Sequence, residues 1–513
     1  MRRIAGLGLA LGVVAPPALA TQTPRSPLAS KMWEQVRAEQ PRIVAELIAF
    51  LRVPNLASDS ADIRANAALL IQMLERRGVS ARLLESPAGG PPAVFGELRT
   101  PGAKRTLVLY AHYDGQPVRA GDWATPPWTP TFRAAPGGLS DPIIQPPADD
   151  TIAVDTRLYA RSAGDDKSPI VAMLAALDAL QRAGARPSVN LKFFFEGEEE
   201  AGSPHLEALL REHAALLRGD VWLFGDGPVH VSGRPQVVLG VRGTLDLELT
   251  LYGPARALHS GHYGNWAPNP IVELAHLISA MRDREGRVQI PGFYDDVPPP
   301  SAAERAAVRT APQTDDSVRR SLGLHRTEGG GALVGERVLQ PALNLRGIAG
   351  GTLGVNAIPT EATASIDFRL VPRQRPERVR QQLEAFLRSR GYSVVHGDEA
   401  PPAAVERTRL VRLAWGEGYA SVRTSPDAPA ARRVAALLGA ATGTAPVVVP
   451  SAGGSLPLDV FRRALDAVPI IVPIVNADNN QHAANENLRL GNFFDGIVVY
   501  GVLMGEWEDR PER

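Results

Sequence analysis

The feature that most constrains the fold of this chain is the alternation of short apolar runs with helical stretches in its first half. Residues 170–180 and 206–217 have helical periodicity, and they are interleaved with the apolar runs. The apolar runs, which we interpret as buried strands, are 107–110, 191–195 and 221–224. Strands that alternate with helices build a mostly parallel sheet with helices on both faces. We therefore predict an α/β domain, preceded by helical stretches at 32–51 and 62–77 and completed by a late strand at 468–475.

A different pattern begins at residue 243. Leucines alternate with polar residues over 243–251, and a second alternating stretch covers 362–370. Such alternation is typical of half-buried antiparallel strands. With an amphipathic helix at 379–387 and helical spacing at 271–281, these strands predict a small α+β domain inserted into the first. The Pro- and Arg-rich region 291–350 is interpreted as a long excursion within this inserted domain.

Residue types that bind metals follow each of the predicted buried strands. They are His112 and Asp114 after the first, Glu198, Glu199 and Glu200 after the second, Asp226 after the third, and His482 after the last. Because the carboxyl ends of parallel strands share one edge of a sheet, a single cleft could collect all of them. Asp165 and Asp166 lie in a turn of small residues before a helix, where they could join the same cleft.

Each of these residues also has an ordinary structural explanation. A run of glutamates is usually a solvated surface, and Asp165 with Asp166 could simply cap a helix. A lone histidine such as His259, or a strand arginine such as Arg369, is commonly a surface residue. Against this, a triple acid directly after a buried strand is costly without a cation or donors. The alignment of all these residues at strand ends favours a shared metal site.

The amino-acid composition excludes several kinds of functional site and partner. The chain has no cysteine, which excludes disulfides, thiolate nucleophiles, cysteine-type zinc sites and iron–sulfur clusters. Any metal must therefore be held by His, Asp and Glu. With 55 basic and 55 acidic residues the formal net charge is zero, so there is no electrostatic case for nucleic acid or for an anionic membrane as partner.

Residues 1–20 have the pattern of a cleaved export signal. Arg2 and Arg3 precede an apolar run at 4–15, and an A-x-A cleavage signature stands at 18–20. The apolar run is well short of the ~20 residues that span a bilayer. We predict an exported protein that is free of the membrane after cleavage. Nearly all the basic charge is arginine, which fits a GC-rich bacterium, so the predicted location is the bacterial periplasm. The pattern leaves the general and the twin-arginine routes open.

From residue 32 onward the sequence resembles the dinuclear zinc metallopeptidase superfamily. This superfamily includes carnosinase-type dipeptidases, aminoacylases, glutamate carboxypeptidases and succinyl-diaminopimelate desuccinylase, and the likeness is greatest to the carnosinase-like branch. Five ordered motifs carry the resemblance: YAHYD at 110–114, ARSAGDDK at 160–167, FEGEEEAGS at 195–203, FGD at 224–226 and HAANE at 482–486.

The resemblance implies a fold and a set of metal ligands. It implies a catalytic domain of residues 28–240 and 423–513 and a ferredoxin-like lid of residues 241–422 that also forms a homodimer. It also implies a cis peptide bond after Asp165. Two divalent ions would bind, Zn²⁺ by family expectation with Mn²⁺ and Co²⁺ as alternatives. The implied ligands are a bridging Asp165, His112 and Asp226 in one site, and Glu200 and His482 in the other, with Asp220 as the fallback for Asp226.

The same resemblance assigns roles to six further residues. Glu199 would be the general base for a metal-bridged water, and Asp114 would orient His112. His259 would reach into the partner's active site and steady the oxyanion. The candidate contacts to the substrate carboxylate end are Arg369, Gly454 and Ser455.

The expected activity is hydrolysis of a peptide bond in dipeptides or short peptides by a metal-dependent exopeptidase. An N-acyl-amino-acid amidohydrolase would use the same metals and base, and a nonenzymatic peptide-binding scaffold is a third hypothesis. Glu199 counts against the scaffold, because a binder needs no base. Three departures from the family pattern are Ser162 and Ser168, where glycine is common, and 450–452, which lacks an Arg-Glu pair. The last leaves the choice of substrate open.

Overall fold

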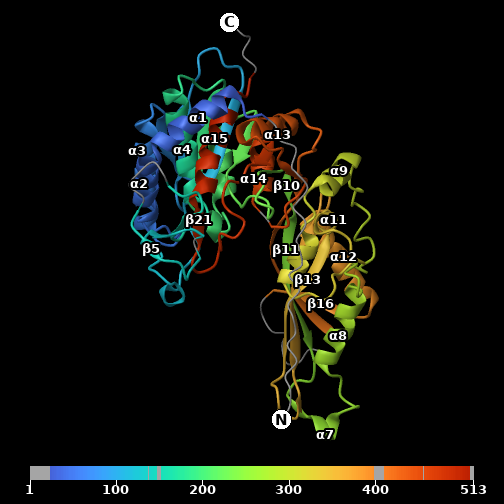
Figure 1. The fold of residues 1–513 in the computed structure, drawn as a ribbon. Coiled ribbons are helices and arrows are strands. Elements are labelled where there is room, and N and C mark those ends of the chain that lie inside the picture. Colours follow the sequence, from blue (N-terminus) through green and yellow to red (C-terminus); the bar gives the residue numbers. More distant parts are fainter. Residues whose placement is uncertain (1–23, 137, 147–151, 398–408, 455, 509–513) are drawn as a thin grey trace, which may run out of the picture.

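The computed structural model describes residues 24–136, 138–146, 152–397, 409–454 and 456–508. These residues form two lobes, one helix-covered and one slender (Figure 1). They are called the catalytic lobe and the lid lobe below, after the two domains that the resemblance implies. The predicted export signal lies outside the described residues. Among the residues described, no helix has the length and apolar character needed to cross a bilayer.

The catalytic lobe is built on an eight-stranded sheet. In spatial order its strands are β1 (Ser80–Leu84), β2 (Ala93–Leu98), β7 (Asn190–Glu196), β3 (Thr106–His112), β8 (Val221–Phe224), β20 (Pro469–Ile471), β9 (Gln236–Val238) and β19 (Val447–Val449). The four central strands, from β7 to β20, run parallel. The pairs β1·β2, β2·β7 and β20·β9 are antiparallel. The predicted parallel arrangement is therefore confirmed at the centre, while the flanks are mixed.

Helices cover both faces of this sheet. One face carries α1 (Pro27–Ala38), α2 (Gln40–Leu51), α3 (Ser60–Glu75), α4 (Lys167–Arg182), α13 (Pro429–Thr442) and α15 (Leu490–Gly505), and the other carries α5 (Leu206–Glu212), α6 (Ala214–Leu217) and α14 (Leu458–Leu465). The helical stretch predicted at 32–51 is thus two helices. The chain leaves the helical conformation at Glu39, because Pro41 cannot donate to the preceding turn and instead lies in the first turn of α2.

An aromatic cluster packs beneath the carboxyl ends of the central strands. Phe461 of α14 is fully buried, and its ring centroid lies 5.2 Å from Tyr110, 5.1 Å from Trp222 and 5.2 Å from Phe224. Phe194 lies 6.1 Å away, with its ring nearly perpendicular. Edge-to-face pairs at these distances stabilise a core beyond the area that they bury. The cluster therefore holds β3, β7 and β8 together where their polar ends begin.

The lid lobe has a five-stranded sheet with helices on one face. In spatial order its strands are β13 (Ala342–Gly350), β15 (Glu361–Leu370), β11 (Gly243–Tyr252), β17 (Leu410–Tyr419) and β16 (Ser393–His396). The helices α8 (Pro270–Met281) and α12 (Pro376–Ser389) share its apolar core. The chain order β11, α8, β13, β15, α12, β17 gives the antiparallel ferredoxin-like arrangement that the resemblance implied, with β16 as an added parallel edge strand.

The predicted excursion at 291–350 is structured and ends in a strand of the lid sheet. It carries α9 (Ala302–Thr310), α10 (Asp315–Ser321) and α11 (Val334–Val338) before β13. The interpretation of this region as an excursion alone was wrong for its last residues. In β13 only Leu343 is buried, because the strand lies at the edge of the sheet. An exposed edge strand has no apolar alternation by which to predict it.

The two lobes meet at a short hinge. There β10 (Gly240–Val241) pairs with β18 (Val422–Arg423), and Gly240 is needed because a Cβ atom would collide with the Val422 carbonyl oxygen. Glu304 of α9 forms an ion pair of 2.8 Å with Arg423, and both side chains are largely buried. Helix α9 of the lid excursion thus contacts the hinge itself.

The remaining short elements flank the lobes. A four-stranded sheet beside the catalytic core has the order β21 (Asn487–Arg489), β6 (Arg157–Tyr159), β4 (Thr131–Arg133) and β5 (Ile143–Ile144). At the lid tip, β12 (Leu258–His259) pairs with β14 (Ala357–Ile358) and leads into α7 (Ser260–Tyr263). Two 3-10 turns lie at Ala120–Asp122 and Glu199–Ala201.

The aromatic cluster generates a stability prediction. Phe461→Ala removes the ring shared by all four neighbours, so the free energy of unfolding should fall by about 3–5 kcal/mol, the usual cost of such a cavity. Urea-induced unfolding followed by tryptophan fluorescence and circular dichroism measures the change. Leu139→Ala, at a position that is 46% exposed, is the matched control. A loss below about 1 kcal/mol for Phe461→Ala would contradict the proposed packing role.

Candidate metal centre

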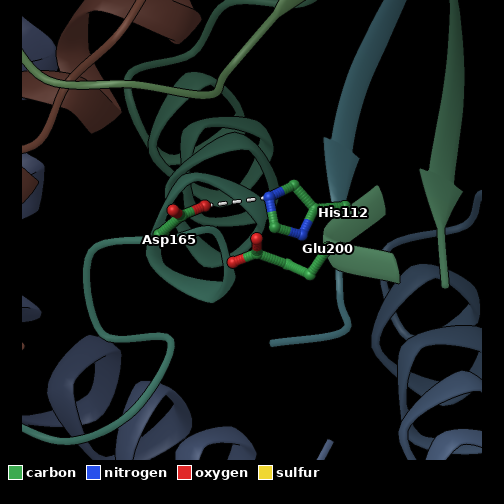
Figure 2. Close-up of side chains that lie close together, drawn as sticks. All are labelled: His112, Asp165 and Glu200. Carbon is green, nitrogen blue, oxygen red and sulfur yellow. Dashed lines mark hydrogen bonds and ion pairs between the residues drawn. The ribbon is translucent and has the colours of Figure 1, made fainter. Parts of the chain in front are cut away.

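Four of the five predicted metal ligands form one cluster with Asp165 at its centre. One ligand atom from each of His112, Asp165 and Glu200 lies within 4.8 Å of the others, and all three side chains converge in Figure 2. His112 Nε2 is 2.9 Å from Asp165 Oδ1. His482 Nε2 is 3.1 Å from Asp165 Oδ2 and 3.3 Å from Glu200 Oε2. Asp165 therefore has a histidine nitrogen on each of its two oxygens.

The fifth predicted ligand, Asp226, faces the same space. Asp226 lines a cavity of about 310 Å³ together with Asp165, Glu199 and His482. The fallback, Asp220, lies at the opposite end of its strand, where it accepts a hydrogen bond from the Thr106 amide and pairs with Arg105. Asp220 is therefore outside the cluster, and Asp226 is the carboxylate that belongs to it.

The cluster concentrates more negative charge than a buried cavity can hold alone. Burial, reinforced by the charge of Asp165, raises the pKa of Asp226 to about 6 and the pKa of Glu200 to about 7. Burial also raises the pKa of Glu199 well above its usual value. At Asp165 burial opposes ionisation, but hydrogen bonds from His112 and His482 hold its pKa below the usual range. A divalent cation would offset this repulsion, and two imidazoles with carboxylates suit Zn²⁺, Mn²⁺ or Co²⁺.

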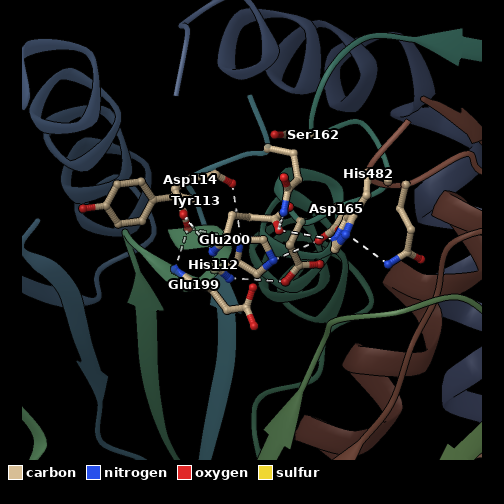
Figure 3. Close-up of polar contacts among 12 residues, drawn as sticks. His112, Tyr113, Asp114, Ser162, Asp165, Glu199, Glu200 and His482 are labelled. Atoms are coloured by element: carbon tan, nitrogen blue, oxygen red, sulfur yellow. Dashed lines mark hydrogen bonds and ion pairs between the residues drawn. The ribbon is translucent and has the colours of Figure 1, made fainter. Parts of the chain in front are cut away.

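Asp114 contacts both His112 and the turn that carries Glu199 and Glu200. Its carboxylate is fully buried and accepts hydrogen bonds from the backbone amides of Glu199, at 3.1 Å, and Glu200, at 3.0 Å (Figure 3). Its Oδ1 also lies 3.3 Å from His112 Nδ1. One carboxylate therefore orients the imidazole and fixes the turn that carries both glutamates. The sequence pattern indicated only the contact between Asp114 and His112.

The Asp165 turn is held by residues that the sequence reasoning missed. The Asp165–Asp166 peptide bond is cis, as the resemblance implied. Ser162 has a φ of 63°, a left-handed conformation that explains why glycine is common there. Asn55 Nδ2 donates to Ser162 Oγ at 2.9 Å and to the Tyr113 carbonyl at 2.8 Å, joining this turn to the loop after His112. No sequence signal marks Asn55, because its partners are far away along the chain.

Two glutamines also contact predicted ligands. Gln116 Nε2 donates to Glu200 Oε2 at 2.6 Å, and Gln481 Nε2 donates to Asp165 Oδ2 at 3.2 Å. Gln116 follows Asp114 closely in the sequence, and Gln481 directly precedes His482. This proximity to predicted site residues is the signal that could have identified both glutamines. They orient carboxylate oxygens that would otherwise rotate.

Known proteins are similar to this chain in sequence. The family profile of the peptidase dimerisation domain matches residues 239–394. Over 93% of this chain and 98% of the relative, the sequence is 26% identical to the Cys-Gly metallodipeptidase dug1 of Schizosaccharomyces pombe. It is also 26% identical to the human Beta-Ala-His dipeptidase, over 81% of this chain and 77% of the relative.

A solved structure agrees with the sequence comparisons. The M20 family metallo-carboxypeptidase Sso-CP2 of Sulfolobus solfataricus superposes with a TM-score of 0.73 and 29% identity, over 91% of this chain and 99% of that chain. The protein is a homologue of the M20 metallopeptidases. Its profile match begins at the hinge and spans most of the lid sheet together with α8 and α12, so the lid lobe carries the dimerisation domain of these enzymes.

The remaining predicted site residues of this M20 homologue are divided between the two lobes. Gly454 lines the cavity, and Ser455 lies outside the described residues. Arg369 is in the lid strand β15, where its Nε donates to Asp367 at 2.9 Å. Within one chain the structure does not bring Arg369 into the lining of the cavity.

His259 lies apart from the metal centre of its own chain. It precedes α7 at the far tip of the lid lobe, as Figure 1 shows, while the ligands lie in the catalytic lobe. Its Nδ1 accepts a hydrogen bond from the Gly261 amide at 3.1 Å, and its exposed ring stacks on His262 with a centroid distance of 4.4 Å. Any contact between His259 and a metal centre in this conformation needs a second chain.

Proposed function

We propose that this protein is a metal-dependent exopeptidase that hydrolyses dipeptides or short peptides. The observation that carries the proposal is the convergence of two histidines and two further carboxylates around Asp165, with Glu199 on the same cavity. A binding protein has no need of Glu199 as a sixth polar group that is not a ligand. The homologues, one named a metallodipeptidase and one a dipeptidase, support the same reaction class.

The proposed ligands are those around the cavity. His112, Asp165, Glu200, Asp226 and His482 hold two divalent cations, of which Zn²⁺ is the first expectation. Such cations, when bound, lower the pKa of a water and polarise the scissile carbonyl. The metal identity and the assignment of each ligand are proposals that rest on the donor set.

Glu199 moves the proton in this proposal. It takes a proton from the attacking water and delivers it to the leaving amine, as a general base and then a general acid. Asp114 keeps Glu199 in place through the Glu199 backbone amide, while it also orients His112. The base is thereby fixed by the same carboxylate that fixes a ligand.

Both the lid and the catalytic domain supply substrate contacts in this proposal. We assign residues 28–240 with 423–513 to the catalytic domain and residues 241–422 to the lid, which forms a homodimer. Arg369 and the 454–455 loop receive the substrate carboxylate. His259 enters the active site of the partner subunit, and its position directly before α7, at the lid tip of its own chain (Figure 1), supports a role across the dimer.

The sequence pattern of residues 1–20 is the basis for a proposed location. Residues 1–20 have a charged start, an apolar run and an A-x-A cleavage signature, and the mature protein is proposed to act in the bacterial periplasm. A peptidase there would act on short peptides outside the cytoplasm.

A substrate panel tests the activity. Chelator-stripped protein should regain release of free amino acids from dipeptides when Zn²⁺ or Mn²⁺ is added, because the cavity carboxylates then hold the cation. The same assay includes N-acyl amino acids. Release confined to acyl substrates would make the protein an amidohydrolase, and no release from either class by metal-loaded protein would favour the scaffold hypothesis.

Replacement of the base separates catalysis from metal binding. Glu199→Gln should lower kcat by about 10²–10⁴-fold, the usual contribution of a general base, and leave the metal content unchanged. Elemental analysis gives the metal content, and steady-state kinetics give kcat. Glu85→Gln, which alters a surface ion pair with Arg64, is the control. Unchanged turnover in Glu199→Gln would remove this residue from the mechanism.

The lid histidine has a matched control beside it. His259→Ala should lower kcat by about 10²–10³-fold, the typical cost of one oxyanion donor, whereas the neighbouring exposed His262→Ala should not. Circular dichroism checks that both variants fold.

Mixing two inactive variants tests the cross-dimer geometry. A hybrid of a Glu199→Gln subunit and a His259→Ala subunit contains one site with both native residues only if His259 acts across the dimer. Subunit exchange should therefore restore part of the activity. A hybrid that stays inactive, despite proven exchange, would place His259 outside the partner's site.

A further inference from the structure

Glu486 is a fully buried carboxylate that contacts neither the cavity nor the cluster of ligand side chains. It belongs to the segment that carries His482, but all four of its donors come from the Asp165 turn. Oε1 accepts hydrogen bonds from the backbone amides of Gly164, at 2.8 Å, and Asp165, at 2.9 Å. Oε2 accepts from the Ser162 amide at 3.1 Å and from Arg161 Nη1 at 2.6 Å.

These contacts organise the backbone of the turn. Three amides of one short segment point at a single carboxylate, and buried amides without a partner are costly. Hydrogen bonds to an ionised acceptor are stronger than neutral ones. Ser162 is already in a left-handed conformation, so the turn needs an outside group to hold it in this shape. Glu486 is that group, and one of its hydrogen bonds comes from the backbone amide of Asp165 itself.

The same carboxylate links two segments that both provide ligands. Asp165 contacts the 481–486 segment through its side chain, at His482 and Gln481, and through its backbone, at Glu486. The positions of the Asp165 and His482 side chains are therefore not independent. A shift of either segment would break contacts at both ends of this short stretch.

We propose that Glu486 is a positioning residue that locks Asp165 and His482 into one preformed unit for metal binding. The proposal rests on the proposed function only in that the centre binds metal. Glu486 touches neither metal nor substrate, and it acts through the backbone of one ligand and the chain direction of the other. Its loss should weaken metal binding while the fold persists.

A nearby ion pair gives a matched control. Arg157 Nη2 pairs with Asp478 Oδ2 at 2.6 Å, which joins the same two parts of the chain as Arg161 and Glu486 do. Asp478 is 67% exposed, and its contact does not touch the Asp165 turn. Asp478→Asn therefore removes a link between the segments without removing the support of the turn.

The experiment compares the Zn²⁺ affinity of metal-free wild type, Glu486→Gln, Glu486→Ala and Asp478→Asn by competition with a chromophoric chelator. In Glu486→Gln an amide N–H₂ group replaces one carboxylate oxygen, and it cannot accept hydrogen bonds from the two donors that it faces. This variant should weaken Zn²⁺ binding by about 10–100-fold, the range seen for residues that orient ligands. Glu486→Ala should weaken it at least as much, and Asp478→Asn should leave it unchanged. Circular dichroism of the metal-free proteins verifies folding, and Glu486→Gln decides if Glu486→Ala does not fold.

Hydrogen exchange in the metal-free proteins gives a second readout. The amides of Ser162, Gly164 and Asp165 should exchange faster in Glu486→Gln than in wild type or Asp478→Asn. Equal Zn²⁺ affinity and equal exchange in Glu486→Gln and wild type would overturn the proposal, as would an equal loss of affinity in Asp478→Asn. Wild type that binds no Zn²⁺ would refute the proposed function, whereas the exchange result would still decide whether Glu486 positions the turn.

Discussion

The structure depends on one electrostatic constraint, the crowding of carboxylates at the carboxyl edge of the central parallel strands. Asp165 lies at the centre of this group, with a histidine nitrogen on each oxygen and further carboxylates around the same cavity. Like charges at this spacing in a buried site cannot all stay ionised without positive charge nearby. The same crowding that would destabilise an ordinary core makes this edge a candidate site for cations.

The surrounding structure serves to hold these groups in place. Beneath them, the aromatic cluster around Phe461 fixes the strands from which His112, Glu200 and Asp226 emerge. Around them, buried polar side chains satisfy the backbone of the connecting loops. Asp114 binds the amides of the glutamate turn, and Asn55 joins the loop after His112 to the Asp165 turn. Packed strands below and hydrogen-bonded loops above allow repelling side chains to stay close together.

The lid lobe is subject to a different constraint, its narrow attachment to the catalytic lobe. Its ferredoxin-like sheet is attached through the short β10·β18 hinge, and its tip, with His259, extends away from the catalytic lobe (Figure 1). Arg369 is engaged with Asp367 in the lid sheet and not with the cavity. One chain thus holds the complete set of candidate ligands, while two of the proposed substrate-facing groups, Arg369 and His259, depend on the lid and on a second subunit.

The sequence by itself determined the α/β core, the inserted α+β lid and the candidate ligands, because each has a local signature. Buried strands are apolar runs, and the ligands follow directly at their ends. The hidden supports were decided only by tertiary structure. The partners of Asn55 and Glu486 are tens to hundreds of positions away, and β13 is an exposed edge strand without alternation. A hydrogen bond between distant segments leaves no periodic trace along the chain, so the residues that position the ligands appear only once the fold has brought their partners together.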